Sequence, residues 1–232
     1  VYVSDLDFVN LDNALIRHVK ARGKRILVIP FKYPSVVERS KLGPVVNIVV
    51  SGKVQAKRRK YLFAILSIVL ASRRSGKQVH LCLNGGVSGS YGIFVFYVSQ
   101  LVNRLFRNLS ITSYKARVSE NQYRDNLRSA HINLLPLTSL YDDGKDSGAF
   151  YDSMQYNMVS ICPDSHLQSI GSLYGAVALG YRSISDLIQL IGTVMSQLEF
   201  YLADSHSKTE AYMHLDFRNY LINELNTLST PR

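Results

Sequence analysis

The chain has 232 residues, of which 47% are hydrophobic and 19% are charged. This balance is typical of a globular protein with a substantial core, and it excludes collagen-like, low-complexity and wholly disordered chains. The formal net charge of +10 favours polyanionic partners, of which nucleic acids and anionic membrane surfaces are the usual ones.

The positive charge is concentrated in the first third of the chain. Residues 1–77 contain 16 of the 27 Lys and Arg residues and only four of the 17 acidic residues, which gives them a net charge of +12. We expect RNA as the partner, and a solvated helix face is the alternative for the densest run, at 57–60. The residues predicted to contact phosphates are Lys53, Lys57, Arg58, Arg59, Lys60, Arg73 and Arg74.

The two cysteines, Cys82 and Cys162, have no second cysteine at ligand spacing. This predicts a reducing compartment, and therefore the cytoplasm, with no metal site. The longest apolar run, 61–71, is shorter than the roughly 20 residues that cross a bilayer, so no membrane partner is expected. Because the chain opens with Val1 in a strand-like segment, we expect it to be part of a larger polypeptide.

Short apolar runs alternate with helical patterns along the first part of the chain. The predicted strands are 1–4, 24–29, 45–50, 78–83, 109–114, 132–135 and 158–162, and the main predicted helices among them are 61–72 and 93–106. The acidic stretch 141–152 is predicted to be a loop. This order indicates an α/β fold, with a Rossmann-like, mostly parallel sheet over residues 1–180.

The last part of the chain, residues 181–232, is predicted to be helical. Ser183-x-x-Asp186 resembles a capping box, and apolar residues recur at helical spacing from Leu187 to Tyr201. We expect this apolar stripe to be a packing face.

The first candidate site lies at the ends of the first two predicted strands. Adjacent parallel strands lie about 5 Å apart, so Asp5 after the first strand and Lys32 after the second can face one cleft. A carboxylate beside a partly buried Lys suits removal of a proton from a hydroxyl group. Asp5 and Lys32 are therefore the predicted catalytic pair.

This segment resembles the second half of the FtsJ-like RNA 2′-O-methyltransferases, including the cap methyltransferases of viral large polymerases. Ser4-Asp5 and Lys32 match its first two motifs, and residues 61–64 match its Tyr-Leu-hydrophobic strand. Lys60 stands where the family has a Glu. The resemblance implies an S-adenosylmethionine-dependent viral enzyme acting on RNA 2′-hydroxyls or caps, with weak or no activity in this piece alone.

Two alternatives stay open. The same segment is similar to a NYN/PIN-type nuclease, because Ser4, Asp5, Asp7 and Phe8 precede Gly23-Lys24 in nearly that family's order. That resemblance implies Mg²⁺ held by clustered carboxylates for RNA cleavage. The other alternative is a non-catalytic RNA-binding or nucleocapsid-type module.

The second candidate site is a glycine-rich loop between a predicted strand and helix, with Gly85, Gly86, Gly89 and Gly92. Such a loop brings backbone N–H groups and a helix N-terminus to a nucleoside cofactor. It resembles the loops of dinucleotide binders and, more loosely, of S-adenosylmethionine enzymes, which would make these glycines cofactor-binding. A plain turn with glycines for close packing is the alternative.

Overall fold

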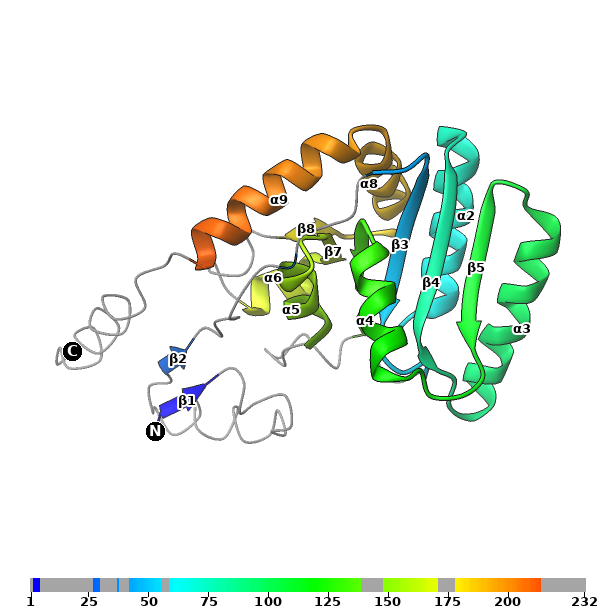
Figure 1. The fold of residues 1–232 in the computed structure, drawn as a ribbon, viewed down its shortest axis with the longest axis horizontal. Helices are drawn as coiled ribbons and strands as arrows, with labels where there is room; N and C mark the ends of the chain where they lie inside the picture. Colours follow the sequence, from blue (N-terminus) through cyan, green and yellow to red (C-terminus); the bar gives the residue numbers. More distant parts are fainter. Residues whose placement is uncertain are drawn as a thin grey trace, which may run out of the picture.

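The computed structural model describes residues 2–4, 27–29, 37, 42–55, 59–138, 148–170 and 178–213. Its main feature is a six-stranded parallel sheet in the order β5-β4-β3-β6-β7-β8 (Figure 1). The strands are β3 (Val45–Ser51), β4 (Gln78–Gly86), β5 (Leu109–Tyr114), β6 (Ile132–Leu134), β7 (Val159–Pro163) and β8 (Ala178–Tyr181). This confirms the predicted α/β, Rossmann-like fold.

The strand order changes direction between β3 and β6. The chain passes outward from β3 to β4 and β5, then returns to place β6 on the other side of β3. In open parallel sheets, ligands bind at the carboxyl ends of the strands near such a switch point. We call the edge where the six strands end the carboxyl edge.

Both faces of the central strands are buried. Val46, Ile48 and Val50 of β3 belong to the core on one face, whereas Val49 packs with Cys82 on the other. This explains why the strand is a continuous apolar run: side chains alternate between two faces that are both covered by helices.

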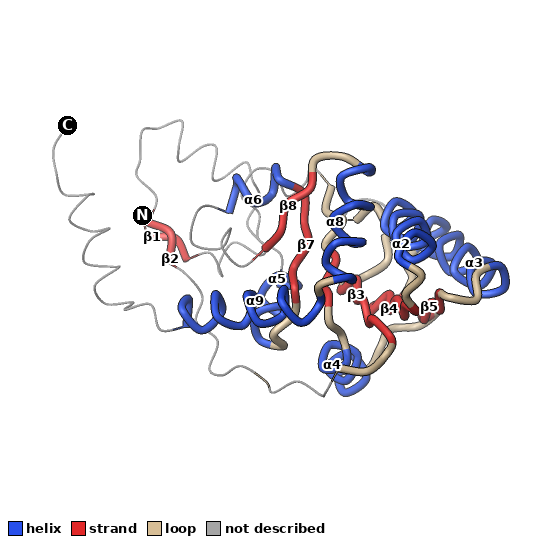
Figure 2. The backbone as a smooth tube through the Cα atoms, turned by 90° about the horizontal axis from the view of Figure 1, so that it is seen from above, coloured by secondary structure: helices blue, strands red, loops and turns tan. Residues whose placement is uncertain are grey.

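Helices cover the two faces of the sheet (Figure 2). Figure 2 shows α2 (Tyr61–Ser75), α3 (Gly89–Leu105) and α8 (Ile184–Ser196) on one face. On the other, α4 (Glu120–Ser129) is joined to α5 (Gly148–Gln155) by a side-chain hydrogen bond. The short helix α6 (Asp164–Ile170) follows β7 directly.

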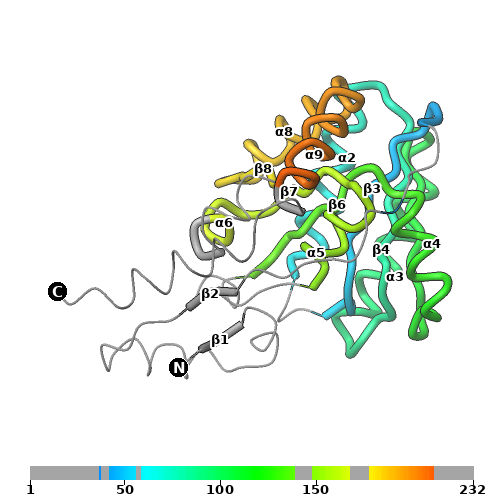
Figure 3. The backbone as a smooth tube through the Cα atoms, turned by 60° about the vertical axis from the view of Figure 1, so that its left-hand side comes forward, coloured from blue at the N-terminus to red at the C-terminus, as the bar shows by residue number. Residues whose placement is uncertain are grey.

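The helical C-terminal region begins at a capped helix. The Ser183 hydroxyl accepts a hydrogen bond from the Asp186 backbone N–H at 3.1 Å, as the sequence pattern predicts. From α8 the chain continues into α9 (Leu198–Met213), where the Ser205 hydroxyl donates to the Met158 carbonyl at the start of β7. Figure 3 shows α8 and α9 near one end of the sheet, away from the loops at the carboxyl edge.

The first two strands form a separate pair. β1 (Tyr2–Ser4) and β2 (Leu27–Ile29) are parallel, with Ser4 opposite Ile29, but they do not join the six-stranded sheet.

The loop predicted at 141–152 is wrong at its end, because residues 148–152 belong to α5. Among the described helices, none is long and apolar enough to cross a membrane.

Candidate functional site

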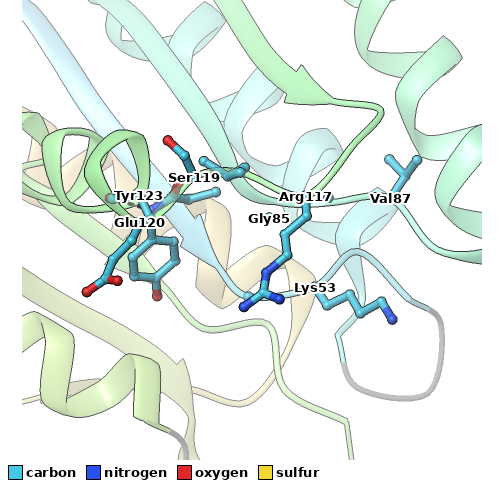
Figure 4. A pocket seen from close by; sticks show the side chains of 11 residues that line it. Lys53, Gly85, Val87, Arg117, Ser119, Glu120 and Tyr123 are labelled. Atoms are coloured by element: carbon cyan, nitrogen blue, oxygen red, sulfur yellow. Dashed lines mark hydrogen bonds between the residues drawn. The ribbon is translucent and has the colours of Figure 1, made fainter.

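A cleft of about 900 Å³ lies at the carboxyl edge, between the loops that follow β3, β4 and β5 (Figure 4). It is lined by Gly52, Lys53, Asn84, Gly85, Gly86, Val87, Arg117, Val118, Ser119, Glu120 and Tyr123. Residues from three loops therefore meet at the carboxyl edge, on the β4 and β5 side of the switch point, and this edge is where a parallel sheet is expected to bind its ligand.

Glycines allow the three loops to approach closely at the base of this cleft. A Cβ at Gly85 would overlap the carbonyl oxygen of Gly52, and a Cβ at Gly86 would lie 2.6 Å from the carbonyl oxygen of Ala116. Gly52 itself has a φ of +103°, which favours glycine. Any side chain at Gly85 or Gly86 would push the loops apart and change the shape of the cleft.

The four glycines that were predicted to bind a cofactor do not all line the cleft. Gly85 and Gly86 line the cleft, whereas Gly89 and Gly92 lie outside its lining. Gly89 begins α3 with a φ of +68°, and a Cβ at Gly92 would lie 2.8 Å from the carbonyl oxygen of Val54. The second pair of glycines thus meets the demands of backbone geometry and packing.

Two cations, Lys53 and Arg117, extend into the open space of the cleft. Figure 4 shows both side chains in the same region, with Tyr123 and Glu120 to one side of Arg117. Both cations are exposed, and within the part of the chain that the structure describes neither forms an ion pair. Their charges are therefore available to an anionic ligand.

Hydrogen bonds fix the wall that α4 contributes. The Asn84 side-chain amide donates to the Tyr123 carbonyl at 3.0 Å. The amide of Asn126 donates to the Asn84 side-chain oxygen at 2.8 Å and to the Tyr114 hydroxyl at 3.0 Å. These bonds hold α4 against the ends of β4 and β5.

Behind this wall, the Tyr123 hydroxyl donates to Asp152 Oδ2 at 2.7 Å. Burial raises the pKa of Asp152 to about 6, although the Tyr123 hydrogen bond and the nearby charge of Arg59 act to lower it. Burial also raises the pKa of the Tyr123 hydroxyl, so Tyr123 stays protonated and donates. The bond links α4 to α5 and fixes the orientation of the Tyr123 ring.

The described cations that were predicted to bind RNA do not share one surface. Lys53 lies in the cleft, Arg59 is only 5% exposed, and Lys60 lines a separate hollow of about 720 Å³. Arg73 and Arg74 lie in the last turn of α2, whose 15 residues span about 22 Å. Lys57 and Arg58 lie outside the described residues, and RNA as a partner stays a prediction.

The predicted catalytic pair, Asp5 and Lys32, also lies outside the described residues. One motif of the methyltransferase resemblance can be examined directly. Residues 61–64, which match a strand of that family, form the first turn of helix α2. Their spacing of apolar residues fits the buried face of a helix as well as it fits a strand.

Sequence reasoning missed Arg117, Glu120 and Tyr123 as cleft residues. The predicted sites were the glycine-rich loop and the ends of the first two predicted strands. The signal that could have found them is topological: 109–114 was predicted to be a strand of a parallel sheet, so the polar residues after it belong at the same edge as Gly85 and Gly86. Asp152 was not predicted to support a site, because its segment was predicted to be a loop.

No protein-family model and no curated protein matches the sequence. The fold, however, is similar to solved structures of glycosyltransferases with the GT-B fold. A Staphylococcus aureus TarM mutant in complex with fondaparinux, alpha-GlcNAc-glycerol and UDP has a TM-score of 0.59 at 12% identity, covering 95% of this chain and 43% of that one. The lipopolysaccharide outer core galactosyltransferase WaaB has a TM-score of 0.56 at 14% identity, with 91% and 59% covered.

A third similar structure is itself a single domain. The C-terminal domain of a glycosyl transferase group 1 family protein, LpcC from Francisella tularensis, has a TM-score of 0.52 at 10% identity, covering 72% of this chain and 85% of that domain. The chain thus spans about half the length of TarM and WaaB but most of the LpcC domain. At these identities the likeness establishes the fold.

These neighbours correct the functional predictions. The expected FtsJ-like methyltransferase, with S-adenosylmethionine as cofactor and a viral capping role, is wrong, and so is the nuclease alternative, because the neighbours are glycosyltransferases. The matching motifs covered short strand ends that many α/β proteins share. As to Mg²⁺, no group of three His, Cys, Asp or Glu residues that could hold a metal ion is found in the described ranges.

Proposed function

We propose that this chain is the nucleotide-sugar-binding part of a glycosyltransferase, and that the carboxyl-edge cleft holds the nucleoside diphosphate. The observation that carries the proposal is the presence of two exposed cations, Lys53 and Arg117, which form no ion pair with any described residue and share the cleft with Gly85 and Gly86 at the strand ends. The TarM structure with UDP supplies the ligand class.

The chemistry of the cleft supports a diphosphate at the cation end. A diphosphate carries several negative charges close together, and Lys and Arg are the side chains that bind phosphate oxygens most strongly. The N-terminus of α4, at Ser119 and Glu120, adds a positive field on the same side of the sheet edge. The nucleoside would then extend toward Tyr123, whose ring offers a stacking surface.

The same cations suit the leaving group of glycosyl transfer. In that reaction the bond between the sugar anomeric carbon and the diphosphate oxygen breaks, and an acceptor hydroxyl oxygen bonds to that carbon and loses its proton. Negative charge develops on the departing diphosphate, where fixed cations stabilise it. We assign binding of the acceptor to the whole glycosyltransferase and not to this chain alone.

Isothermal titration calorimetry with UDP and uridine tests this function. We expect UDP to bind, and Lys53→Ala and Arg117→Ala each to weaken UDP binding roughly 10-fold, the size of one exposed charge-assisted hydrogen bond. Arg128→Ala, which removes an equal charge from the far end of α4, is the matched control. Uridine lacks the diphosphate, so its binding should not change in the cleft variants.

The proposal fails if UDP does not bind the wild-type chain. It also fails if Arg128→Ala weakens UDP binding as much as Arg117→Ala does, because a general loss of positive charge would then explain the effect.

A further inference from the structure

Helix α3 carries an apolar stripe on the side that faces away from the core. It consists of Ile93, Phe94, Tyr97, Leu101 and Leu105, which are 52–64% exposed. At about 100° of rotation per residue these positions fall within an arc of roughly 120° on the helix surface. We call this set the α3 stripe.

The stripe is not the face that anchors α3 to the protein. Val95, Ser99 and Val102 are the residues that α3 buries in the core, next to β5. A surface helix with one packing face normally has a polar opposite face. In α3 both faces are apolar, and Figure 1 shows the helix beside β5, at the outer end of the sheet. The exposed fractions of its side chains show that the stripe is open to solvent.

Cations surround the α3 stripe. The Lys115 ammonium lies 5.0 Å from the centre of the Phe96 ring and 5.9 Å from that of Tyr97. Arg104 is in the last turn of α3, and the Arg73 guanidinium lies 5.9 Å from the centre of the Phe106 ring, just beyond the helix. Arg107 follows Phe106 directly, and Arg73, Arg104, Arg107 and Lys115 are all exposed.

No acidic residue offsets these cations along the chain. The sequence contains no Asp or Glu between Glu38 and Glu120, so α2, α3, β4 and β5 carry none. The next acids along the chain, Glu120 and Asp125, belong to α4, which lies on the other face of the sheet (Figure 2). The surface around α3 is therefore both apolar and uniformly positive.

We propose that the α3 stripe docks on an anionic membrane surface, with α3 lying in the plane of the interface. Apolar side chains on one face and Lys and Arg at the border are the features by which interfacial helices bind anionic lipids. The proposal revises the expectation of no membrane partner, which rested on the absence of a spanning segment. It is independent of the proposed function, because no residue of the stripe lines the carboxyl-edge cleft.

Two other occupants fit the surface less well. In a symmetric pair of chains joined through α3, the positively charged borders of the two copies would come together without an acidic residue of 39–119 to pair with them, and like charges oppose such contact. The phosphates of RNA would pair with the cations, but Ile93, Leu101 and Leu105 offer RNA neither stacking nor hydrogen bonds. A lipid surface uses both the charges and the aliphatic side chains.

Sedimentation with vesicles tests the proposal on the full chain. We expect binding to vesicles containing 30% phosphatidylserine in phosphatidylcholine, and much weaker binding to phosphatidylcholine alone. The double variant Phe94→Ser/Leu101→Ser should bind at least 10-fold more weakly, because both side chains leave the acyl region. The variant Arg104→Gln/Arg107→Gln should bind roughly 30-fold more weakly, and added salt should reduce its remaining binding less than that of the wild type.

Matched controls separate this surface from general effects. Phe200→Ser removes from α9 the large apolar side chain that is most exposed, at 66%, among the residues that the structure describes. Arg128→Gln/Lys208→Gln removes two charges from α4 and α9. Both controls should bind vesicles as the wild type does, and all four variants should retain wild-type UDP binding.

Three results would overturn the proposal. One is a wild-type chain that does not sediment with phosphatidylserine vesicles. Another is a dimer in analytical ultracentrifugation that Phe94→Ser/Leu101→Ser converts to a monomer, which would assign the stripe to a second copy. The third is binding of RNA that depends on Arg104 and Arg107, with vesicle binding unaffected by either stripe variant.

Discussion

Asp152 illustrates how one buried residue supports the cleft without lining it. Its carboxyl group accepts the Tyr123 hydrogen bond that joins α5 to α4, and burial raises its pKa to about 6. The charge of Arg59 offsets only part of the cost of burial. At neutral pH the folded chain therefore holds a carboxylate that solvation in the unfolded chain would stabilise better.

This predicts a pH-dependent effect of Asp152→Asn on stability. The folded carboxyl group takes up its proton near pH 6, but the unfolded one only near pH 4, so the stability that Asp152 contributes is complete below about pH 4 and is lost as the pH rises through about 6. In urea unfolding, the stability of Asp152→Asn relative to the wild type should rise by about 1–2 kcal/mol between pH 5 and pH 8. A difference that is constant with pH would show that Asp152 ionises as it does in water.

Between elements, the decisive contacts are those of backbone with backbone at the ends of β3, β4 and β5. The Gly52 N–H donates to the Asn84 carbonyl at 3.2 Å, and the Val54 N–H donates to the Gly86 carbonyl at 3.1 Å. These bonds bring the loops so close that Gly85 has no room for a Cβ. The shape of the cleft thus depends on the absence of side chains at its glycine positions as much as on the side chains that line it.

Gly85→Ala should therefore destabilise the chain by about 3 kcal/mol, because the new methyl group overlaps backbone atoms that cannot rotate away. Gly192→Ala in α8 is the matched control. A Cβ there meets nothing within 4 Å, so the better helix propensity of Ala should stabilise the chain by about 0.5–1 kcal/mol. Urea unfolding of both variants measures the difference, and equal effects would contradict the close approach at Gly85.

The elements with strong local signals could be predicted from the sequence. The strands at 45–50, 78–83 and 109–114 were predicted to within three residues. Apolar runs and nearby glycines mark the first two, and alternating apolar residues, Leu109 and Ile111, mark the third. The helix α5 was missed because its stability comes from packing: Phe150, Tyr151 and Met154 are buried in a core cluster, which no local pattern reveals.

At the scale of the whole molecule, position along the chain was a poor guide to position in space. Lys57 to Lys60 were treated as one phosphate-binding group, yet Arg59 pairs its backbone with Leu137 and is buried, while Lys60 is exposed. Lys53 and Arg117 line the same cleft although β4 and β5 lie between them in the sequence. The arrangement of the strands brings such pairs together, and single short motifs do not contain that information.

The predicted methyltransferase family was wrong because it, too, was inferred from short motifs and not from the arrangement of the strands. The methyltransferase resemblance rested on residues at the ends of two short strands, which belong to a separate pair and not to the six-stranded sheet. The similarity in fold to the glycosyltransferase structures rests instead on the course of 72–95% of the backbone, at 10–14% identity. The carboxyl edge as the place of the cleft and Lys53 as a candidate phosphate-binding cation could be predicted from the sequence, but Arg117 was missed.

A crystal structure of this chain with UDP would test the central claim most directly. Diphosphate oxygens should lie within about 3 Å of the Lys53 ammonium and the Arg117 guanidinium, with the nucleoside on the Tyr123 side of the cleft. A diphosphate bound elsewhere, for example in the hollow lined by Lys60 and Arg182, would contradict it.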